Sequence, residues 1–309
     1  MNKPDKLTDK KDTAPPDGDG QSGQPPERAG EFHRFRTVFF GRYVVVFGCV
    51  IVVLFIIAAI FAPLISPNNP YKQDLRNTLQ KPSAQHWLGT DPYGRDTLSR
   101  VIYGTRTSLM VGVVAVGIAA LIGVTLGLVS GYFGSWLDII LMRVIDGMMS
   151  VPSLVLALVF AAVIGGGLKN VMIAIGIAMV PVYCRLMRGQ VLSVRQADYV
   201  LAAHSLGSSD VRIMLRHILP NCLPPLIVLI TLNLGTAILA EAGLSFIGVG
   251  IAPPGAAWGS MINEGYNYLM INPVLSFAPG TCILLLVLSF NMVGDGLRDA
   301  LDPRLRGII

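Results

Sequence analysis

The run YVVVFGCVIVVLFIIAAIFAPLI, residues 43–65, decides the fold class, because its 23 residues include no charged side chain. A helix needs about 20 mainly apolar residues to cross a bilayer. The run is longer than the apolar core of a signal peptide, so we expect it to remain in the protein as a membrane anchor. Residues 1–36, before this run, are rich in Asp, Lys, Gly, Pro and Gln, and this composition predicts a disordered tail.

Five further apolar blocks follow, at approximately 109–129, 144–164, 171–186, 223–247 and 274–293. Hydrophobic residues make up 52% of the chain and charged residues only 14%, which is well below the share in a soluble domain. The sequence therefore predicts an all-α membrane protein with six transmembrane helices. The block 171–186 is short and contains Pro181, and we expect its helix to continue beyond the bilayer through Arg188.

Six crossings would place both termini on one side of the membrane. Under this topology 17 Lys and Arg residues lie inside and 7 outside, in the direction of the positive-inside rule. We therefore expect both termini in the cytoplasm. The expected divisions are a tail (1–36), a first transmembrane helix with an external segment (37–108), a core of five helices with an inner loop at 189–220 (109–300) and a cytoplasmic C-terminus (301–309).

The inner loop contains the most patterned polar segment, QADYVLAAHSLGSSDVRIMLRHILPN (196–221). Tyr199, Ala202, Ala203 and Leu206 recur at helical spacing and form a face of small and apolar groups, and Gly207 suits a helix end. A second helix is predicted next, capped by Ser208, Ser209 or Asp210. Its expected features are an apolar face of Val211, Met214, Leu215 and Ile218, two basic residues, Arg212 and Arg216, on another face, and a return to the membrane at Leu219 and Pro220.

Two interpretations of this segment are open. One is an amphipathic hairpin at the membrane interface. The other is an element that docks on a partner protein, which the small residues favour because they permit close approach of another backbone.

The segments AAHSLG and RHILP within this loop resemble the EAA signature of permease subunits of ABC importers, although Leu201 stands where that signature has an acidic residue. Other segments resemble the dipeptide, oligopeptide and nickel branch of that family, specifically its second, C-type permease. They are HWLGTDPYGRDTLSRVIYGTRTSL, GYFGSWLDIILMRVIDGMMSVPSLVLAL, LSFIGVGIAPPGAAWGSMI and FNMVGDGLRDALDPRLRG.

The resemblance implies the fold of a type I ABC importer permease in a bacterial inner membrane. It also implies four kinds of partner: a second, different permease, two ATPase subunits, an extracytoplasmic binding protein and the lipid membrane. The inner loop would contact the ATPases. The expected substrate is a di- or oligopeptide, with nickel or another small solute as the alternative.

Two outer segments contain residues of interest. Glycines and charged residues in 86–109 suggest tight turns joined by charge pairs, with a landing surface for the binding protein as the alternative. The loop 248–272 is expected to form a cap over the pore, and its candidate contacts with a binding protein are Pro253, Pro254, Trp258 and Glu264. Trp258 and Tyr266 could instead anchor the loop at the membrane interface.

Ionisable and amide side chains within apolar blocks are costly and mark candidate pathway residues, here Glu241 and Asn291. For Glu241, a hydrogen bond to a Ser or Thr on a neighbouring helix is the structural alternative. Asp146 and Asp295 are expected near the cytoplasmic ends of their helices, paired with Arg143 or Arg298.

Several other classes of function are disfavoured. The sequence contains no GxxxxGK[ST], HExxH or GxSxG motif, so we expect no catalytic activity, no cofactor and no metal site, and ATP hydrolysis in separate subunits. The basic residues do not alternate with aromatic ones, which argues against nucleic acid. An intramembrane enzyme using Glu241 and Asp146 would need both carboxylates at one depth, and a self-sufficient secondary transporter would normally show internal repeats.

Overall fold

The computed structural model describes residues 31–251 and 254–301, without the side chains of residues 31–35. Within these residues the structure is helical and contains no strand, only an isolated bridge between Thr90 and Asp96. The helices are, in chain order, α1 (Glu31–Phe40), α2 (Tyr43–Ile60), α3 (Ala62–Ile65), α4 (Thr97–Phe133), α5 (Ser135–Met149), α6 (Ser153–Ile164), α7 (Leu168–Val194), α8 (Asp198–Ser205), α9 (Asp210–Ile213), η1 (Met214–Ile218), α10 (Leu219–Phe246), α11 (Trp258–Tyr266) and α12 (Val274–Leu301).

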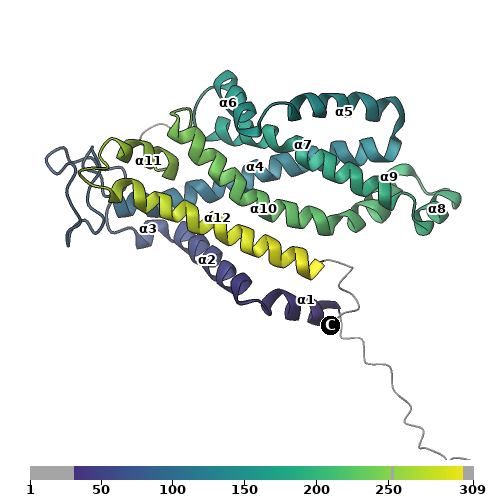
Figure 1. Cartoon of the computed structure of the whole chain (residues 1–309), viewed down its shortest axis with the longest axis horizontal. Helices are drawn as coiled ribbons and strands as arrows, with labels where there is room; N and C mark the ends of the chain where they lie inside the picture. Colours follow the sequence, from purple (N-terminus) through teal and green to yellow (C-terminus); the bar gives the residue numbers. More distant parts are fainter. Residues whose placement is uncertain (1–30, 252–253, 302–309) are drawn as a thin grey trace, which may run out of the picture.

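The long helices form an elongated bundle with two distinct ends (Figure 1). One end carries α11 and the irregular segment 66–96, and we call it the α11 end. The other carries α8 and α9, and we call it the α8 end. Helices α4, α7 and α12 run toward the α8 end, and α10 runs back from it.

Five helical segments are long and apolar enough to cross a membrane, and a sixth span results if α5 and α6 count as one. These two helices meet at an angle of 94°, so the block 144–164 is not the continuous helix that we expected. The physical reason is Pro152. Proline has no N–H to donate, and it disfavours the helical conformation of the residue before it, so α5 ends before Pro152 and a new helix begins at Ser153. Helix α7 does continue to Val194 through Pro181, as predicted.

Helix α4 begins well before the expected start of its block. The Asp96 side chain caps it by accepting a hydrogen bond of 2.9 Å from the Ser99 backbone N–H. The segment 97–108, which we assigned to an external loop, is therefore the first part of a 37-residue helix. Asp is one of the residue types that commonly cap helices, so the sequence does contain a local signal for a helix start at Asp96.

The α4–α7 pair forms the centre of the bundle, and glycines set its close spacing. Gly123, Gly127 and Gly131 recur every four residues along α4 and face α7. A Cβ atom on Gly123 would lie 2.6 Å from the Cβ of Tyr183, and one on Gly131 would lie 2.8 Å from the Cβ of Val191. Small residues at this spacing let the backbones of membrane helices approach closely, so these positions tolerate only glycine.

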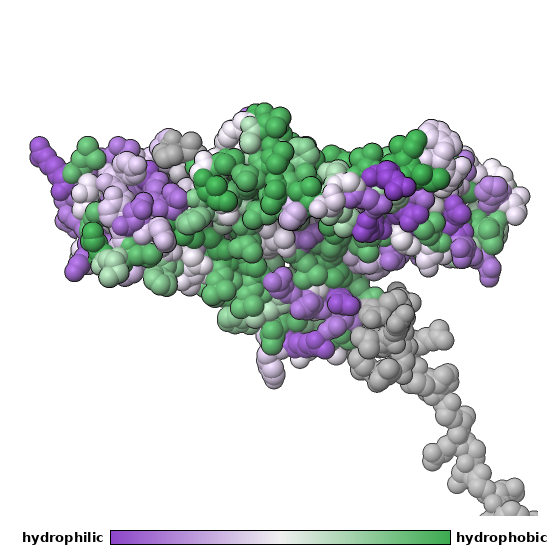
Figure 2. All heavy atoms as spheres, turned by 45° about the horizontal axis from the view of Figure 1, so that its top comes forward, coloured by the Kyte–Doolittle hydropathy of each residue, from purple (hydrophilic) through white to green (hydrophobic). Residues whose placement is uncertain are grey.

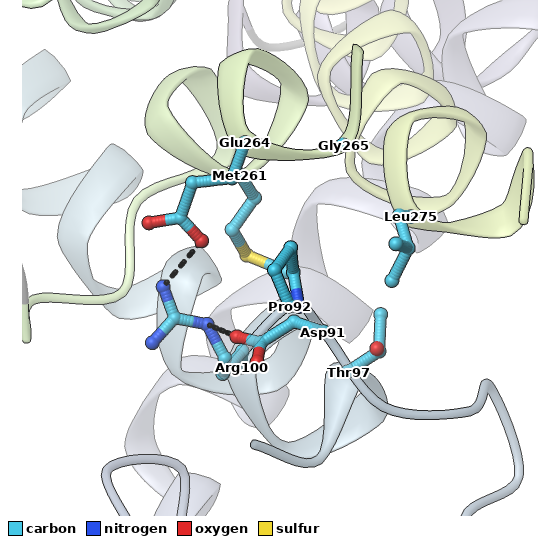
Figure 3. Close-up of a pocket in the computed structure, with 8 residues that line it drawn as sticks. All are labelled: Asp91, Pro92, Thr97, Arg100, Met261, Glu264, Gly265 and Leu275. Carbon is cyan, nitrogen blue, oxygen red and sulfur yellow. Dashed lines mark ion pairs between the residues drawn. The ribbon is translucent and has the colours of Figure 1, made fainter. Parts of the chain in front are cut away.

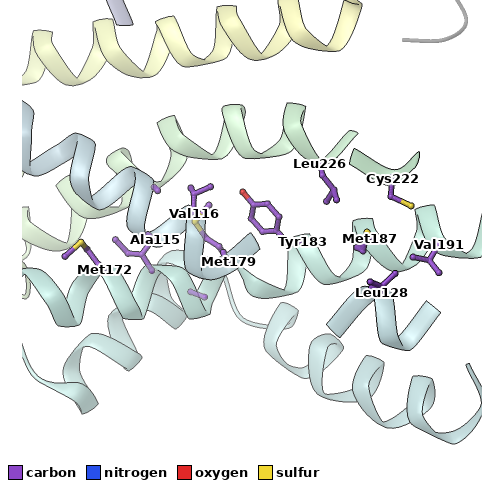
Figure 4. Packing of buried hydrophobic residues seen from close by; sticks show 14 of the residues in the cluster. Ala115, Val116, Leu128, Met172, Met179, Tyr183, Met187, Val191, Cys222 and Leu226 are labelled. Carbon is purple, nitrogen blue, oxygen red and sulfur yellow. The ribbon is translucent and has the colours of Figure 1, made fainter. Parts of the chain in front are cut away.

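The main apolar core follows this contact. It runs along α4, α7 and α10, and residues such as Val116, Tyr183, Met187, Cys222 and Leu226 are spread along it (Figure 4). The four cysteines are unpaired, and Cys184 and Cys222 are buried.

The surface separates by polarity. Apolar residues gather over the middle of the visible face, and hydrophilic residues gather toward its ends (Figure 2). This distribution is the one expected of a bundle that crosses a bilayer.

Helix α1 begins within the segment that we predicted to be a disordered tail. Residues 31–36 were expected in the disordered tail, but they begin a helix that packs against α12. Phe39 is buried, and Arg42, just after the helix, forms an ion pair of 2.5 Å with Asp299 of α12. The rest of the predicted tail, residues 1–30, and most of the predicted C-terminus, residues 302–309, lie outside the described residues.

Candidate functional site

Helix α8 is the outermost element at the α8 end (Figure 1). It ends as the sequence predicts, because Gly207 adopts a positive φ of 75° and its N–H donates a hydrogen bond of 3.0 Å to the His204 carbonyl. The following N–H, of Ser208, donates to the Ala203 carbonyl at 3.1 Å. A left-handed residue at this position satisfies the last carbonyls of the helix and turns the chain sharply.

The two sides of α8 have different environments. Val200 and Ala203 are buried against the bundle, whereas Tyr199, Leu201, Ala202 and Leu206 are exposed. Leu206 has 85% of its surface exposed. The four residues of the predicted face are therefore divided between two environments: Ala203 packs against the bundle, whereas Tyr199, Ala202 and Leu206 are exposed together with Leu201. Large apolar side chains left uncovered at a polar end of the molecule mark a surface for a partner.

The second predicted helix of this loop is present, but its apolar face differs from our expectation. Ile213, Met214 and Ile218 are buried, whereas Val211 and Leu215 are exposed. The π-helical turn η1 shifts the register between them, and sequence spacing alone did not indicate it. Arg212 and Pro220 are exposed and Leu219 is half-buried. Helices α9, η1 and α10 follow one another without a break, so the turn after α8 leads into a continuous helical segment that includes a membrane span.

Polar contacts fasten this loop to the ends of α4 and α7. The Tyr132 hydroxyl donates a hydrogen bond of 2.6 Å to Asp210. Arg195 donates to the backbone carbonyl of Tyr132 at 2.7 Å and to that of Gly131 at 3.3 Å. A cavity of about 560 Å³ lies between these residues and α8. Local sequence spacing does not indicate these contacts, because the partners of Tyr132 and Arg195 lie 78 and 63 residues away.

Two further ion pairs strengthen the same end of the bundle. Arg188 donates to both carboxylate oxygens of Asp138, at 2.6 and 2.7 Å, and Ser130 donates to Asp138 at 2.5 Å. Asp146 pairs with Arg185 at 2.5 Å, not with Arg143 or Arg298 as we expected. The reason is that α5 lies alongside α7 beyond the turn at Gly134, which brings Asp146 to Arg185.

The α11 end holds a buried cluster of charges (Figure 3). Arg95 donates to Asp91 at 2.5 Å and to Glu264 at 2.7 Å. Arg100 lies 3.5 Å from Asp91 and 3.7 Å from Glu264. The cluster thus joins the segment before α4, α4 itself and α11. Burial raises the pKa of Glu264 above its ordinary value, and the neighbouring Arg100 and Arg95 oppose that shift.

This cluster confirms the turns and charge pairs expected in 86–109. Gly89 and Gly94 have positive φ angles of 75° and 71°, and Asp96 pairs with His86 at 2.8 Å. In the cap, Trp258 is fully buried and its indole N–H donates to the Val101 carbonyl at 3.0 Å. This placement is at odds with Trp258 as an interface anchor or a binding-protein contact, because it has no accessible surface.

Two other candidate contacts in the cap, Pro254 and Glu264, lie beside the charge cluster. The Pro254 carbonyl accepts a hydrogen bond of 3.4 Å from Arg100, and Glu264 belongs to the charge cluster. Pro253 lies outside the described residues.

The two candidate pathway residues have different environments. Asn291 is exposed on α12. Glu241 has no accessible surface and accepts a hydrogen bond of 2.6 Å from Ser245, one turn further along its own helix. This burial favours a structural role for Glu241, although the partner is not on a neighbouring helix. Among the described residues no group of three or more His, Cys, Asp or Glu side chains could hold a metal ion.

Comparison with known families identifies two matching regions. Residues 123–307 match the family described as binding-protein-dependent transport system inner membrane component. Residues 31–82 match the N-terminal TM domain of oligopeptide transport permease C.

Curated relatives match along most of the chain. The dipeptide transport system permease protein DppC of Alkalihalophilus pseudofirmus is 46% identical over 84% of this chain and 85% of its own length. The probable D,D-dipeptide transport system permease protein DdpC of Escherichia coli is 45% identical over 91% of this chain and 95% of its own. The glutathione transport system permease protein GsiD of Escherichia coli is 41% identical over 92% of this chain and 94% of its own.

Solved structures of inward-facing conformations of the MetNI methionine ABC transporter share the fold. Two of them give TM-scores of 0.52 and 0.55, at 18% and 20% identity. Each match covers 66% of this chain, and 96% and 97% of the respective solved chain.

Proposed function

The chain belongs to the binding-protein-dependent transport system inner membrane components, in the branch of C-type permeases of peptide and nickel ABC importers, and from this premise we propose that it carries peptides. It would form half of the translocation pathway together with a second, different permease. Two ATPase subunits would supply the energy, and a soluble binding protein would deliver the substrate. The relatives named for dipeptide and glutathione transport support a peptide substrate.

The observation that carries the docking part of this proposal is the two-sided environment of α8. Its outer side presents apolar groups such as Leu206 and Leu201, which an ATPase subunit would cover. Its inner side is anchored by Val200 and Ala203. A helix that is free on one side and fixed on the other transmits a displacement instead of absorbing it.

The contacts behind α8 define where such a displacement would go. One route leads through Asp210 and Tyr132 to α4, and another leads through the unbroken α9–η1–α10 segment into the membrane. Movement of the ATPases would therefore tilt α4 and α10 together as rigid bodies. This chain would hydrolyse no ATP itself.

The proposed orientation places α8 and both termini in the cytoplasm. Five arginines, Arg185, Arg188, Arg195, Arg212 and Arg216, lie in or near the α8 end, which supports this orientation by the positive-inside rule. The α11 end, with its charge cluster, would then face the binding protein.

The docking surface is tested by co-purification of the complete transporter in mild detergent. Leu206→Asp places a charge on the outer side of α8 without altering its anchors. The matched control is Leu75→Asp, since Leu75 is a similarly exposed leucine at the opposite end, with 72% of its surface exposed. Gly207 is a poorer target because any side chain there would strain its left-handed backbone.

We expect Leu206→Asp to keep the second permease and lose the ATPases, and Leu75→Asp to keep both. If the Leu206→Asp transporter still retains the ATPases, α8 is not the docking element. If the chain purifies alone and moves peptide in liposomes without ATP, the importer proposal itself is wrong.

A further inference from the structure

Two cavities lie between α7 and α10. The larger, of about 510 Å³, opens near the α8 end and also touches α12. Its lining includes Leu186, Gln190, Asn221, Val228, Leu232 and Arg298. The smaller, of about 180 Å³, lies further from the α8 end and is covered by α6, with Thr236, Leu239 and Met179 among its lining residues.

The two cavities share one face of each helix. On α10 the lining residues recur every three or four positions, from Asn221, Val228 and Leu232 in the first cavity to Thr236 and Leu239 in the second. Residues at this spacing lie on one side of a helix. Leu232 and Thr236 are only one turn apart, so the cavities form consecutive parts of one groove, which we call the α7–α10 groove.

The larger cavity is lined by a charged side chain and by amide side chains as well as by apolar ones. The Arg298 side chain has no ion-pair partner within the described residues. The Asn221 side-chain N–H donates a hydrogen bond of 2.7 Å to the His217 carbonyl, so its side-chain oxygen remains available to accept a hydrogen bond from a ligand. Arg298 lies in the last turn of α12 and Asn221 in the first turn of α10, and both are exposed, so a cation and an amide stand at one end of the cavity.

The backbone of α10 adds further acceptors to this face. Pro224 and Pro225 both line the larger cavity and have no N–H. The carbonyls of Pro220 and Asn221, four residues earlier, therefore lack their usual helical donors. Backbone carbonyls that lack their helical donors are tolerated in a membrane protein where the helix lines a cavity.

We propose that the α7–α10 groove is this chain's share of the translocation pathway, and that its occupant is a short peptide whose carboxylate meets Arg298. The proposal rests on the proposed function of the chain. The Pro220 and Asn221 carbonyls and the Asn221 and Gln190 side chains would bind peptide amides, and the guanidinium of Arg298 would bind a carboxylate. Val228, Leu232 and Leu239 would contact side chains of any sequence, which suits a pathway that passes many peptides.

Two neighbouring residues on α10 provide a matched test of water access. Val228 lines the groove, whereas Ile227 is exposed, with 41% of its surface accessible, but lines neither cavity. Each is replaced by cysteine, as is Thr236, in a chain whose four native cysteines have been changed to alanine. Membrane vesicles containing the complete transporter are then treated with a charged, membrane-impermeant methanethiosulfonate reagent.

We expect Val228→Cys and Thr236→Cys to react, and a transported dipeptide to slow their reaction, while Ile227→Cys stays unlabelled. The inference is overturned if the two groove positions are as unreactive as Ile227→Cys, which would mean that lipid or the second permease covers the groove. ATP-dependent dipeptide uptake by the same cysteine-free vesicles is measured in parallel. Uptake without groove labelling rejects only the groove, whereas absence of uptake rejects the proposed peptide importer.

The role of Arg298 is tested with Arg298→Gln and two substrates, a dipeptide and its C-terminally amidated form. We expect the variant to lower uptake of the free dipeptide roughly tenfold, the size of one lost charge-assisted hydrogen bond, and to leave uptake of the amide nearly unchanged. Equal losses for both substrates would show that Arg298 does not contact the carboxylate.

Discussion

The hydroxyl of Tyr132 donates a hydrogen bond of 2.6 Å to Asp210 and so joins the end of α4 to the first turn of α9. The Arg195 side chain holds the backbone carbonyl of the same tyrosine at 2.7 Å. The ends of α4 and α7 and the loop that contains α8 and α9 therefore meet at one residue. This connection gives that loop a direct contact with α4, the helix that packs most closely against α7.

Removal of this hydrogen bond should weaken the transmission of movement without removing the docking surface. We expect Tyr132→Phe to lower ATP-dependent uptake by a factor of roughly 2 to 10, the kinetic equivalent of one hydrogen bond. Co-purification of the ATPases should not change. Tyr43→Phe is the control, because Tyr43 has 92% of its surface exposed. Asp210→Asn keeps an acceptor oxygen and should retain more activity than Asp210→Ala; equal activity of all these variants would contradict the role of the bond.

The glycines of α4 lead to a second prediction. A Cβ on Gly127 would lie 2.8 Å from the Cβ of Met187 and 3.0 Å from the backbone nitrogen of Arg188, and neither atom can move independently of α7. Gly127→Ala should therefore destabilise the protein by about 1–3 kcal/mol, as overpacking does. Gly117 lies on the same helix with no atom within 4 Å of the added carbon, so Gly117→Ala should be neutral or slightly stabilising.

Thermal unfolding in detergent, followed by the loss of the monodisperse peak in size-exclusion chromatography, measures this difference. Similar midpoints for the two variants would mean that the α4–α7 contact is looser than these distances indicate.

A buried and an exposed ion pair should contribute differently to the stability of the protein, which is the third prediction. Arg95 is buried, with 1% of its side chain exposed, and it bonds to both Asp91 and Glu264. Arg95→Met would leave the buried Asp91 carboxylate and the partly buried Glu264 carboxylate with only the longer contacts to Arg100, so we expect a loss of about 3–5 kcal/mol in the free energy of unfolding. Arg42 pairs with Asp299 but is 64% exposed, and Arg42→Met should cost at most about 1 kcal/mol. The same thermal assay ranks the two variants, and an equal loss would show that the cluster is open to water.

Much of the bundle was predictable from the sequence because membrane spans and helix ends carry local signals. The apolar runs predicted the spans, and Gly207 predicted the end of α8. The bend at Pro152 also had a local signal, but the apolar residues on both sides suggested one continuous span. The spacing of Gly123, Gly127 and Gly131 was visible as well, but only the structure identifies α7 as the helix they face.

Contacts between distant segments were not predictable in the same way. The charge cluster joins Arg95 to Glu264, which is 169 residues away, and either side chain alone could be a surface charge. Ala203 illustrates a subtler limit. Its spacing places it beside Tyr199 and Leu206, yet burial depends on how the whole helix rests on the bundle.

Glu241 provides the last prediction, because its two sequence interpretations lead to different outcomes. Its carboxyl group is fully buried, accepts a hydrogen bond from Ser245 at 2.6 Å, and has no ion-pair partner within the described residues. Glutamine keeps an oxygen that can accept the same bond, so we expect Glu241→Gln to retain uptake within a factor of about 2, since no hydrogen bond of appreciable strength is lost. Ser245→Ala should instead lower the free energy of unfolding by about 1–3 kcal/mol by leaving a buried acceptor without its donor. If Glu241→Gln abolishes uptake while its thermal stability and ATPase co-purification stay normal, the carboxylate must reach the substrate in another conformation, and the pathway role would be correct.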